Sequence, residues 1–170
     1  GANQLDRPRY IAVYGNGDLY ISDYENNRIQ KWAPGATEGI TVAVEVIQPF
    51  GITVDASGNL YISDYGEDRN SPRSARVQKW EPGASQGTTV AGGNGNGSAA
   101  NQLSFAGGIA LDFDENIYIA DVGNHRIQKW APGASEGTTV AGGIPKGSAA
   151  NQLNLPIDIT LDVSGNLYIA

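Results

Sequence analysis

Residues Ile117 to Trp130 read IYIADVGNHRIQKW, and this stretch decides the fold because the chain repeats it. Leu19 to Trp32 reads LYISDYENNRIQKW, and Leu60 to Trp80 reads LYISDYGEDRNSPRSARVQKW, which is the same pattern with extra residues in its middle. The last four residues, Leu167 to Ala170, read LYIA and begin a fourth copy. The chain therefore contains three and a half copies of one sequence repeat.

Each copy has the pattern of two short strands joined by a polar turn. In the segment LYISD at 19–23, successive side chains point alternately to two faces of a pleat, with Leu19 and Ile21 on the same face. The segment RIQKW at 28–32 again carries β-branched and aromatic residues, and the polar YENN between the two suits a tight connection. The core of the repeat is therefore predicted to be a β-hairpin.

Two further strands are predicted around each hairpin. In the first unit they are Tyr10–Val13 before it and Ile40–Val44 after it. Asn16-Gly17 supplies the positive φ of a tight turn after the first strand, and Pro34-Gly35 is a type II turn signal after the third. The equivalent strands are Ile52–Asp55, Thr88–Ala91, Ile109–Asp112, Thr138–Ala141 and Ile159–Asp162. Four antiparallel strands in a unit of about 40 to 50 residues predict an all-β fold built of β-propeller blades.

The units divide the chain into blades of one propeller segment. We predict blade 1 at 1–46, blade 2 at 47–100, blade 3 at 101–150 and a partial blade 4 at 151–170. The second unit is longer because of an insertion in its hairpin, and repeat architectures tolerate such changes in loops. The glycine-rich segment Gly92 to Ser98 has no helix after it, so we interpret it as a flexible linker and not as a phosphate-binding loop.

The composition excludes several classes of protein. Eleven basic and 18 acidic residues give a net charge of −7, which repels nucleic acid. No apolar run approaches the roughly 18 residues of a membrane-spanning helix, and no signal peptide is visible. The chain has no Cys, which excludes disulfides and thiolate metal sites. The partners that remain are proteins or glycans, with no nucleic acid and no membrane insertion.

The segment Gly108 to Trp130, GIALDFDENIYIADVGNHRIQKW, resembles a blade of the NHL-repeat family, and Asn124-His125-Arg126-Ile127 nearly spells the motif that names it. The resemblance covers the whole chain. It implies a propeller, usually of six blades, in which the first strand of each blade lines the central channel and the fourth is outermost.

Three and a half blades do not close such a ring. An unpaired first blade would leave apolar side chains such as Ile11, Val13, Leu19 and Ile21 in water, at about 1.5 to 3 kcal/mol each. We therefore expect further blades in a longer chain, or several copies that complete the ring together. A fragment is the favoured alternative, since the sequence contains no Met.

Acidic and basic residues recur at fixed places in the repeat. Because an Asp–Arg pair recurs in every complete hairpin, we interpret it as a structural fastener and not as an active site. The pairs are Asp23 with Arg28, Asp64 with Arg76, and Asp121 with Arg126. Asp55, Asp112 and Asp162 precede the first turn and are predicted to cap it as Asx turns, whereas Tyr14 stands there in the first unit. No cofactor is expected, with a calcium ion on one of these acidic turns as the alternative.

The sequence predicts no catalytic residue. His125 is the only histidine, and its counterparts are Asn27 and Ala75, so we expect a surface turn residue. The amidating lyases that resemble this family by fold carry zinc on several histidines. This segment has a single histidine and cannot build such a site. A GxSxG elbow and a Cys nucleophile are also absent from the sequence.

Binding by loops is the predicted function. In propellers, the loops from strand two to three and from strand four to the next blade share the usual ligand face. The insertion Gly66 to Ser74 falls there, and binding residues concentrate on such loops. Exposed Tyr beside Arg and Asp suits carbohydrate or protein loops. The predicted ligand-binding residues are Arg9, Tyr10, Tyr24, Phe50, Tyr65, Glu67, Arg69 and Asp158. Trp32, Trp80 and Trp130 close the third strands, where we expect them to pack rather than to stack on sugars.

Two functions from different classes remain. The first is a non-enzymatic binding or scaffold module, secreted or at the cell surface, that recognises protein or carbohydrate or builds a larger extracellular assembly. The second is a fragment of a propeller-type lyase or hydrolase whose catalytic residues lie outside this segment. Nearly identical blades favour the first, because a catalytic funnel needs asymmetry. The acidic, Cys-free composition rich in Gly and Asn favours export.

Overall fold

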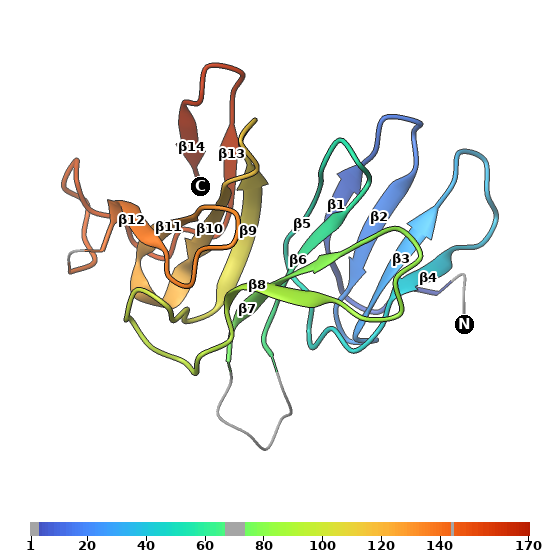
Figure 1. Cartoon of the computed structure of the whole chain (residues 1–170), viewed down its shortest axis with the longest axis horizontal. Coiled ribbons are helices and arrows are strands. Elements are labelled where there is room, and N and C mark those ends of the chain that lie inside the picture. Colours follow the sequence, from blue (N-terminus) through green and yellow to red (C-terminus); the bar gives the residue numbers. More distant parts are fainter. Residues whose placement is uncertain (1–3, 67–73, 144) are drawn as a thin grey trace.

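A computed structural model of the chain describes residues 4–66, 74–143 and 145–170 and contains three four-stranded antiparallel sheets and one two-stranded sheet (Figure 1). Blade 1 consists of β1 (Pro8–Val13), β2 (Leu19–Asp23), β3 (Arg28–Trp32) and β4 (Ile40–Ala43). Blade 2 consists of β5 (Ile52–Val54), β6 (Leu60–Asp64), β7 (Arg76–Trp80) and β8 (Thr88–Gly92). Blade 3 consists of β9 (Ala106–Leu111), β10 (Ile117–Asp121), β11 (Arg126–Trp130) and β12 (Thr138–Gly142), and blade 4 of β13 (Ile159–Leu161) and β14 (Leu167–Ile169).

The predicted four-stranded blade is confirmed, and the hairpin strands begin and end at the predicted residues. The inner strands differ slightly from the prediction. β1 and β9 begin earlier because Pro8 and Ala106 pair with the Asp that ends the neighbouring strand. β5 and β13 end before Asp55 and Asp162, since these side chains cap the following turn.

The turn chemistry read from the sequence is also confirmed. Gly35 has a φ of 75°, and the amide of Ala36 donates to the carbonyl of Ala33 at 3.0 Å, as in a type II turn. Gly17 has a φ of 88° in the first turn of blade 1, and Glu115 takes the equivalent left-handed conformation in blade 3 with a φ of 60°.

The core lies between neighbouring blades, each of which has two different apolar faces. The face turned to the preceding blade carries two Ile, a Leu or Ile and a Trp, and we call it the Trp face. The face turned to the following blade carries Tyr, Val or Ile, and Ala, and we call it the Tyr face. Tyr20, Ile29 and Ala43 of blade 1 pack on Ile52, Leu60, Ile62 and Trp80 of blade 2. Tyr61, Val77 and Ala91 of blade 2 pack on Ile109, Ile117, Ile119 and Trp130 of blade 3.

The Trp face of blade 1 has no blade upon it in the described chain. Its Ile11 is 54% exposed and the neighbouring Val13 is 66% exposed, as predicted, whereas Leu19 and Ile21 are half-buried. Trp80 and Trp130 are buried, which confirms their packing role, and Trp32 on the uncovered face is half-buried. The exposure of these side chains therefore follows the presence of a neighbouring blade.

The glycine-rich segment after blade 2 is not the flexible linker that we predicted. Arg126 donates hydrogen bonds to the carbonyls of Ser98, Ala99 and Gln102, at 2.9 to 3.0 Å. Asn124 donates to the carbonyl of Gly97, so that Gly97 and Ser98 of the segment and the two carbonyls after it are all bound. The segment is therefore fastened to blade 3 by its hairpin.

Helical structure in the described chain is limited to the 3₁₀ turn η1 (Val122–Asn124) between β10 and β11. None of it has the length and hydrophobicity that a membrane crossing requires.

Candidate functional site

The β2–β3, β6–β7 and β10–β11 connections and the entries to the inner strands lie together at one end of the blades, which we call the loop face. In Figure 1 the end of β6 and the start of β7 mark this face at the bottom, and the β1–β2 and β13–β14 connections mark the opposite face at the top. All the predicted binding residues in the described chain belong to segments at the loop face.

A left-handed residue precedes every inner strand at this face. The backbone φ is 49° at Arg7, 51° at Gln48, 59° at Phe105 and 54° at Leu155. Sequence reasoning missed this turn, because none of the four is Gly or Asn and three of them precede Pro, which ordinarily favours an extended residue before it. The repeated conformation gives every blade the same entry to its inner strand.

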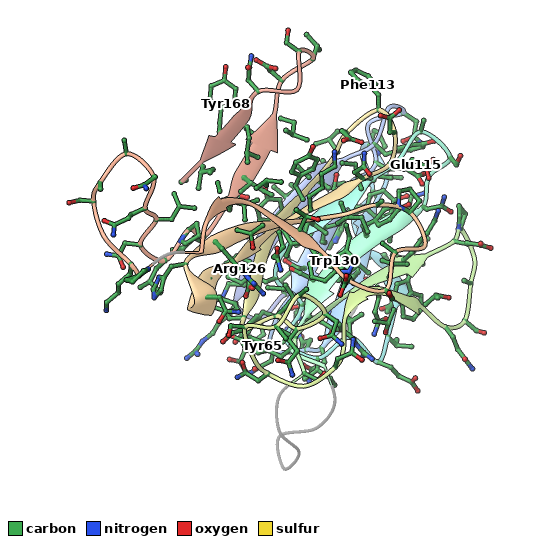
Figure 2. All side chains as sticks on the ribbon, turned by 60° about the vertical axis from the view of Figure 1, so that its left-hand side comes forward. Tyr65, Phe113, Glu115, Arg126, Trp130 and Tyr168 are labelled. Atoms are coloured by element: carbon green, nitrogen blue, oxygen red, sulfur yellow. The ribbon has the colours of Figure 1, made fainter. Side chains whose placement is uncertain are left out.

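Three aromatic rings form a cluster on the loop face. The ring of Phe105 stacks on Tyr65, with centroids 5.1 Å apart and an angle of 8°, and meets the edge of Phe50 at 5.4 Å and 89°. All three side chains are half-buried. Figure 2 shows Tyr65 at the lower end of the blades, beside the β6–β7 connection. The structure thus brings together the predicted Phe50 and Tyr65, and adds Phe105, whose position before a predicted inner strand was the one signal for it.

A second group at this face joins Arg9 and Tyr24. The guanidinium of Arg9 lies 4.8 Å from the centroid of the Tyr24 ring, within the range of a cation–π contact. Beside it, Arg7 makes an exposed ion pair with Glu25 at 3.3 Å. The Arg9–Tyr24 pair therefore presents a positive charge and an aromatic ring at the loop face.

Tyr10 and Asp158 form the third group and connect the inner strands of the first and last blades. The Tyr10 hydroxyl donates to Oδ1 of Asp158 at 2.8 Å. Burial, followed by the bond to Asp158 and its charge, raises the pKa of Tyr10 to about 12. Blades 2 and 3 have Gly51 and Gly108 at the matching position, and a Cβ on Gly108 would collide with the Asp158 carboxylate. Gly108 therefore leaves the space that the Asp158 carboxylate occupies.

The predicted binding residues thus form three sets of contacts, and Arg9 and Tyr10, from two of these sets, line one surface hollow. Glu67 and Arg69, which were predicted to bind from the insertion, lie outside the described residues.

The Asp–Arg pairs are structural fasteners, as predicted. The Arg Nε lies 2.7 Å from the carboxylate of Asp23, 2.9 Å from that of Asp64 and 2.7 Å from that of Asp121. Asp121 also accepts from the amide of Ser104, so it holds the entry to β9. Burial raises the pKa of the Asp64 and Asp121 carboxyls, against the opposing effect of their Arg partners.

The predicted Asx turns are also present. In blade 2, Oδ1 of Asp55 accepts from the amides of Ser57 and Asn59, and Oδ2 accepts from the Asn59 side chain. Asp112 and Asp162 make the same bonds in their own turns. Within the described ranges, no three His, Asp or Glu side chains are grouped so that they could hold a metal ion.

His125 is a turn residue that also links two blades. Its φ is 54°, and its Nδ1 accepts from the amide of Leu155 at 2.9 Å. In blade 1 the equivalent Asn27 accepts from the amide of Gln48 at the same distance, 2.9 Å, through its side-chain oxygen. The shared contact explains why either residue type stands at this position.

Comparison with known proteins agrees with this architecture. The NHL repeat family matches residues 5–32 and 103–130, which run from the entry to the inner strand to the Trp of blades 1 and 3. The sequence matches no curated protein.

Several solved structures share the fold. A chain of the nidogen/laminin complex matches with a TM-score of 0.75 and 21% identity over 98% of this chain and 56% of that chain. The virginiamycin B lyase of Staphylococcus aureus, solved with quinupristin, matches with a TM-score of 0.66 and 16% identity over 100% of this chain and 49% of that one. An auxiliary nutrient binding protein of Bacteroides thetaiotaomicron matches with a TM-score of 0.68 and 16% identity over 91% of this chain and 43% of that one.

The chain spans about half the length of these structures, at 56%, 49% and 43% of each. At such identities the likeness shows the fold, while the two family matches show the type of repeat. This chain therefore contains NHL repeats at residues 5–32 and 103–130, and its described residues form three four-stranded β-propeller blades and two strands of a fourth.

Proposed function

We propose that this chain is a non-enzymatic binding or scaffold module whose loop face recognises protein or carbohydrate, or builds a larger extracellular assembly. The observation that carries the proposal is the half-buried cluster of Phe50, Tyr65 and Phe105. Aromatic side chains offer a large contact area with two rotatable bonds each, which makes them frequent anchors of binding surfaces. Arg9 on Tyr24 adds a positively charged contact on the same loop face.

The structural relatives are compatible with this proposal but do not select it by themselves. One matching chain was solved as part of a complex of nidogen and laminin. The same fold occurs in a lyase and in a nutrient binding protein, and a fold hosts many functions. The argument therefore rests on the loop-face residues of this chain.

The likeness to the lyase supports a second candidate, a propeller-type lyase or hydrolase whose catalytic residues lie outside this segment. Metal analysis of the intact protein separates the two candidates. Stoichiometric zinc or iron would favour the enzyme.

The uncovered Trp face of blade 1 supports a further part of the proposal, in which another blade completes the propeller at this edge. Ile11 and Val13 are more than half exposed, and covering each such side chain contributes roughly 1.5 to 3 kcal/mol. A Tyr face of the kind found on blades 1 and 2 is the matching surface, whether the blade belongs to the same chain or to another copy. We place the assembled propeller outside the cell or at its surface.

The loop face is tested by offering the intact protein purified extracellular matrix proteins and an array of glycans. We expect a retained partner to be lost when Tyr65→Ala and Phe105→Ala are combined. The control is Phe113→Ala, because Phe113 is 86% exposed at the β9–β10 turn of the opposite face. The proposal would be contradicted if the double variant still bound the partner, or if only Phe113→Ala lost it.

A further inference from the structure

The nearly identical blades provide an internal reference for residues that depart from the repeat. Four departures fall at two turns of adjacent blades. In the first turn of blade 1, Tyr14 stands where the other blades have Asp, and Asp18 stands where they have Asn. Asn16 in the same turn replaces Ser or Asp, and Glu81 after β7 replaces the Ala of blades 1 and 3.

These four residues line one cavity. It has a volume of about 250 Å³ and lies between blades 1 and 2, at the β1–β2, β5–β6 and β7–β8 turns. These turns belong to the face opposite the loop face (Figure 1). Tyr14, Asn16 and Asp18 enter the cavity from blade 1 and Glu81 from blade 2, so departures on two blades converge on one space.

The polar groups of the cavity are held in place by one another. Oδ2 of Asp18 accepts from Nζ of Lys31 at 2.6 Å and from Nδ2 of Asn16 at 2.7 Å. The Lys31 bond, followed by the Asn16 bond, lowers the pKa of Asp18, so the carboxylate is ionised at neutral pH. Although Tyr14 replaces the Asp of the other blades, Asp18 in the place of their Asn keeps a carboxylate beside Lys31. In blades 2 and 3, Asp55 and Asp112 pair with the equivalent Lys. Preserving that ion pair requires neither Tyr14 nor Glu81.

Aromatic surface accompanies these polar groups. Tyr14, Tyr20 and Trp80 line the cavity, and the Tyr14 hydroxyl donates to the carbonyl of Ala56 at 3.1 Å, which fixes its ring across the junction of the two blades. Nζ of Lys31 lies 5.7 Å from the centroid of the Tyr20 ring. The cavity therefore combines the half-buried Tyr14 ring, two carboxylates and one ammonium group, with the buried Tyr20 and Trp80 in its wall.

We propose that this cavity is a carbohydrate-binding site that takes a single neutral sugar residue. Carboxylate and ammonium groups match the hydroxyls of a sugar as acceptors and donors, and aromatic rings match its C–H face. Asp18 and Glu81 oppose an anion, and Lys31 already lies against the Tyr20 ring, where an organic cation would otherwise bind. A volume below the roughly 300 Å³ of the smallest drug-sized pockets suits one sugar ring. The site lies on the other face from the proposed loop-face site, and neither depends on the other.

The test uses the intact protein and a panel of methyl glycosides of glucose, galactose, mannose and N-acetylglucosamine. Binding is detected by saturation-transfer difference NMR and its affinity is measured by calorimetry. We expect millimolar binding of at least one glycoside, and a loss of about tenfold with Glu81→Ala, because a hydrogen bond to a charged group is removed. Blades 1 and 3 already have Ala at this position, so the variant is compatible with the fold.

A second variant combines Tyr14→Asp with Asp18→Asn and thereby restores the turn of the other blades. It should also bind at least about tenfold more weakly, because it removes the Tyr14 ring and moves the carboxylate from position 18 to position 14. The matched control is Glu136→Ala, an exposed glutamate after β11 that lies outside the cavity. The proposal is overturned if no glycoside binds, if the two cavity variants bind like the wild type, or if lysine or tetramethylammonium binds in preference to every sugar.

Discussion

At the scale of single residues, buried carboxylates hold both the hairpins and the segments between blades. Asp121 pairs with Arg126, accepts from Ser104 and Asn124, and is fully buried. The spacing of Asp and Arg in the sequence was enough to predict the pair. The capture of linker carbonyls by Arg126 was not predictable, because the glycine-rich segment carries no apolar pattern that fixes its path.

Asp121→Ala should lower the free energy of unfolding by about 3 to 5 kcal/mol, since it leaves the buried guanidinium of Arg126 without its carboxylate. Urea unfolding followed by Trp fluorescence measures the change. Glu25→Ala is the control, because it breaks the exposed pair with Arg7 and should cost less than about 1 kcal/mol. Equal effects of the two variants would show that the buried pair is not a fastener.

The Asp18 carboxyl should make stability depend on acid pH. Its pKa is lowered from 3.8 by Lys31 first and by Asn16 second. A folded-state pKa below the unfolded value stabilises the fold above the unfolded value, and this contribution disappears as the pH falls through the folded value. Between about pH 5 and pH 3, urea midpoints should therefore fall less for Asp18→Asn than for the wild type. An identical fall in both would contradict the assignment.

At the scale of strands and turns, much of the blade was predictable. Alternating apolar residues fixed the hairpin strands, and Pro-Gly and Asn-Gly fixed the turns, because these signals are local. The division of each sheet into a Trp face and a Tyr face was not predicted, since the alternation of residues does not tell which blade covers which face. The left-handed conformation at Gln48 and Phe105, before the inner strands, was also missed. These residue types do not favour a positive φ, so the sequence carries no local signal for it.

Gly142, at the end of β12, has a backbone conformation that only glycine should tolerate without a loss of stability. Its φ is 68°, and a Cβ there would collide with the carbonyl oxygen of His125. Gly142→Ala should therefore cost more than about 1 kcal/mol in urea unfolding. Gly15→Ala is the control, because a Cβ at Gly15 meets no atom within 4 Å, and it should change stability by less than about 0.5 kcal/mol. A neutral Gly142→Ala would mean that β12 ends in another conformation.

At the scale of the molecule, the candidate site depends on how distant blades meet. Arg9, Tyr10, Tyr24, Phe50, Tyr65 and Asp158 could be assigned to one face from the repeat alone. Their division into three groups could not, because the contact between Tyr10 and Asp158 spans 148 residues and depends on the curvature of the whole array. Nor did the sequence show that departures in blades 1 and 2 converge on one cavity.

The contact between the first and last blades should be visible in the titration of Tyr10. Asp158→Asn should move the pKa of Tyr10 down from about 12 but leave it above 10.0, because burial is the larger cause of the shift. NMR of protein labelled with ¹³C at the tyrosine Cζ measures this value. An unchanged pKa would show that the two inner strands do not meet.

The central proposal is that every Trp face in the propeller is covered by the Tyr face of the blade before it, including the Trp face of blade 1. Hydrogen exchange of the intact protein, followed by mass spectrometry, tests this claim most directly. We predict that the amides of β1 and β2 are protected to within about tenfold of those of β5 and β6, because both pairs are then buried between blades. Exchange of β1 and β2 as fast as in the turns, with β5 and β6 still protected, would show that blade 1 is an open edge and would contradict the account.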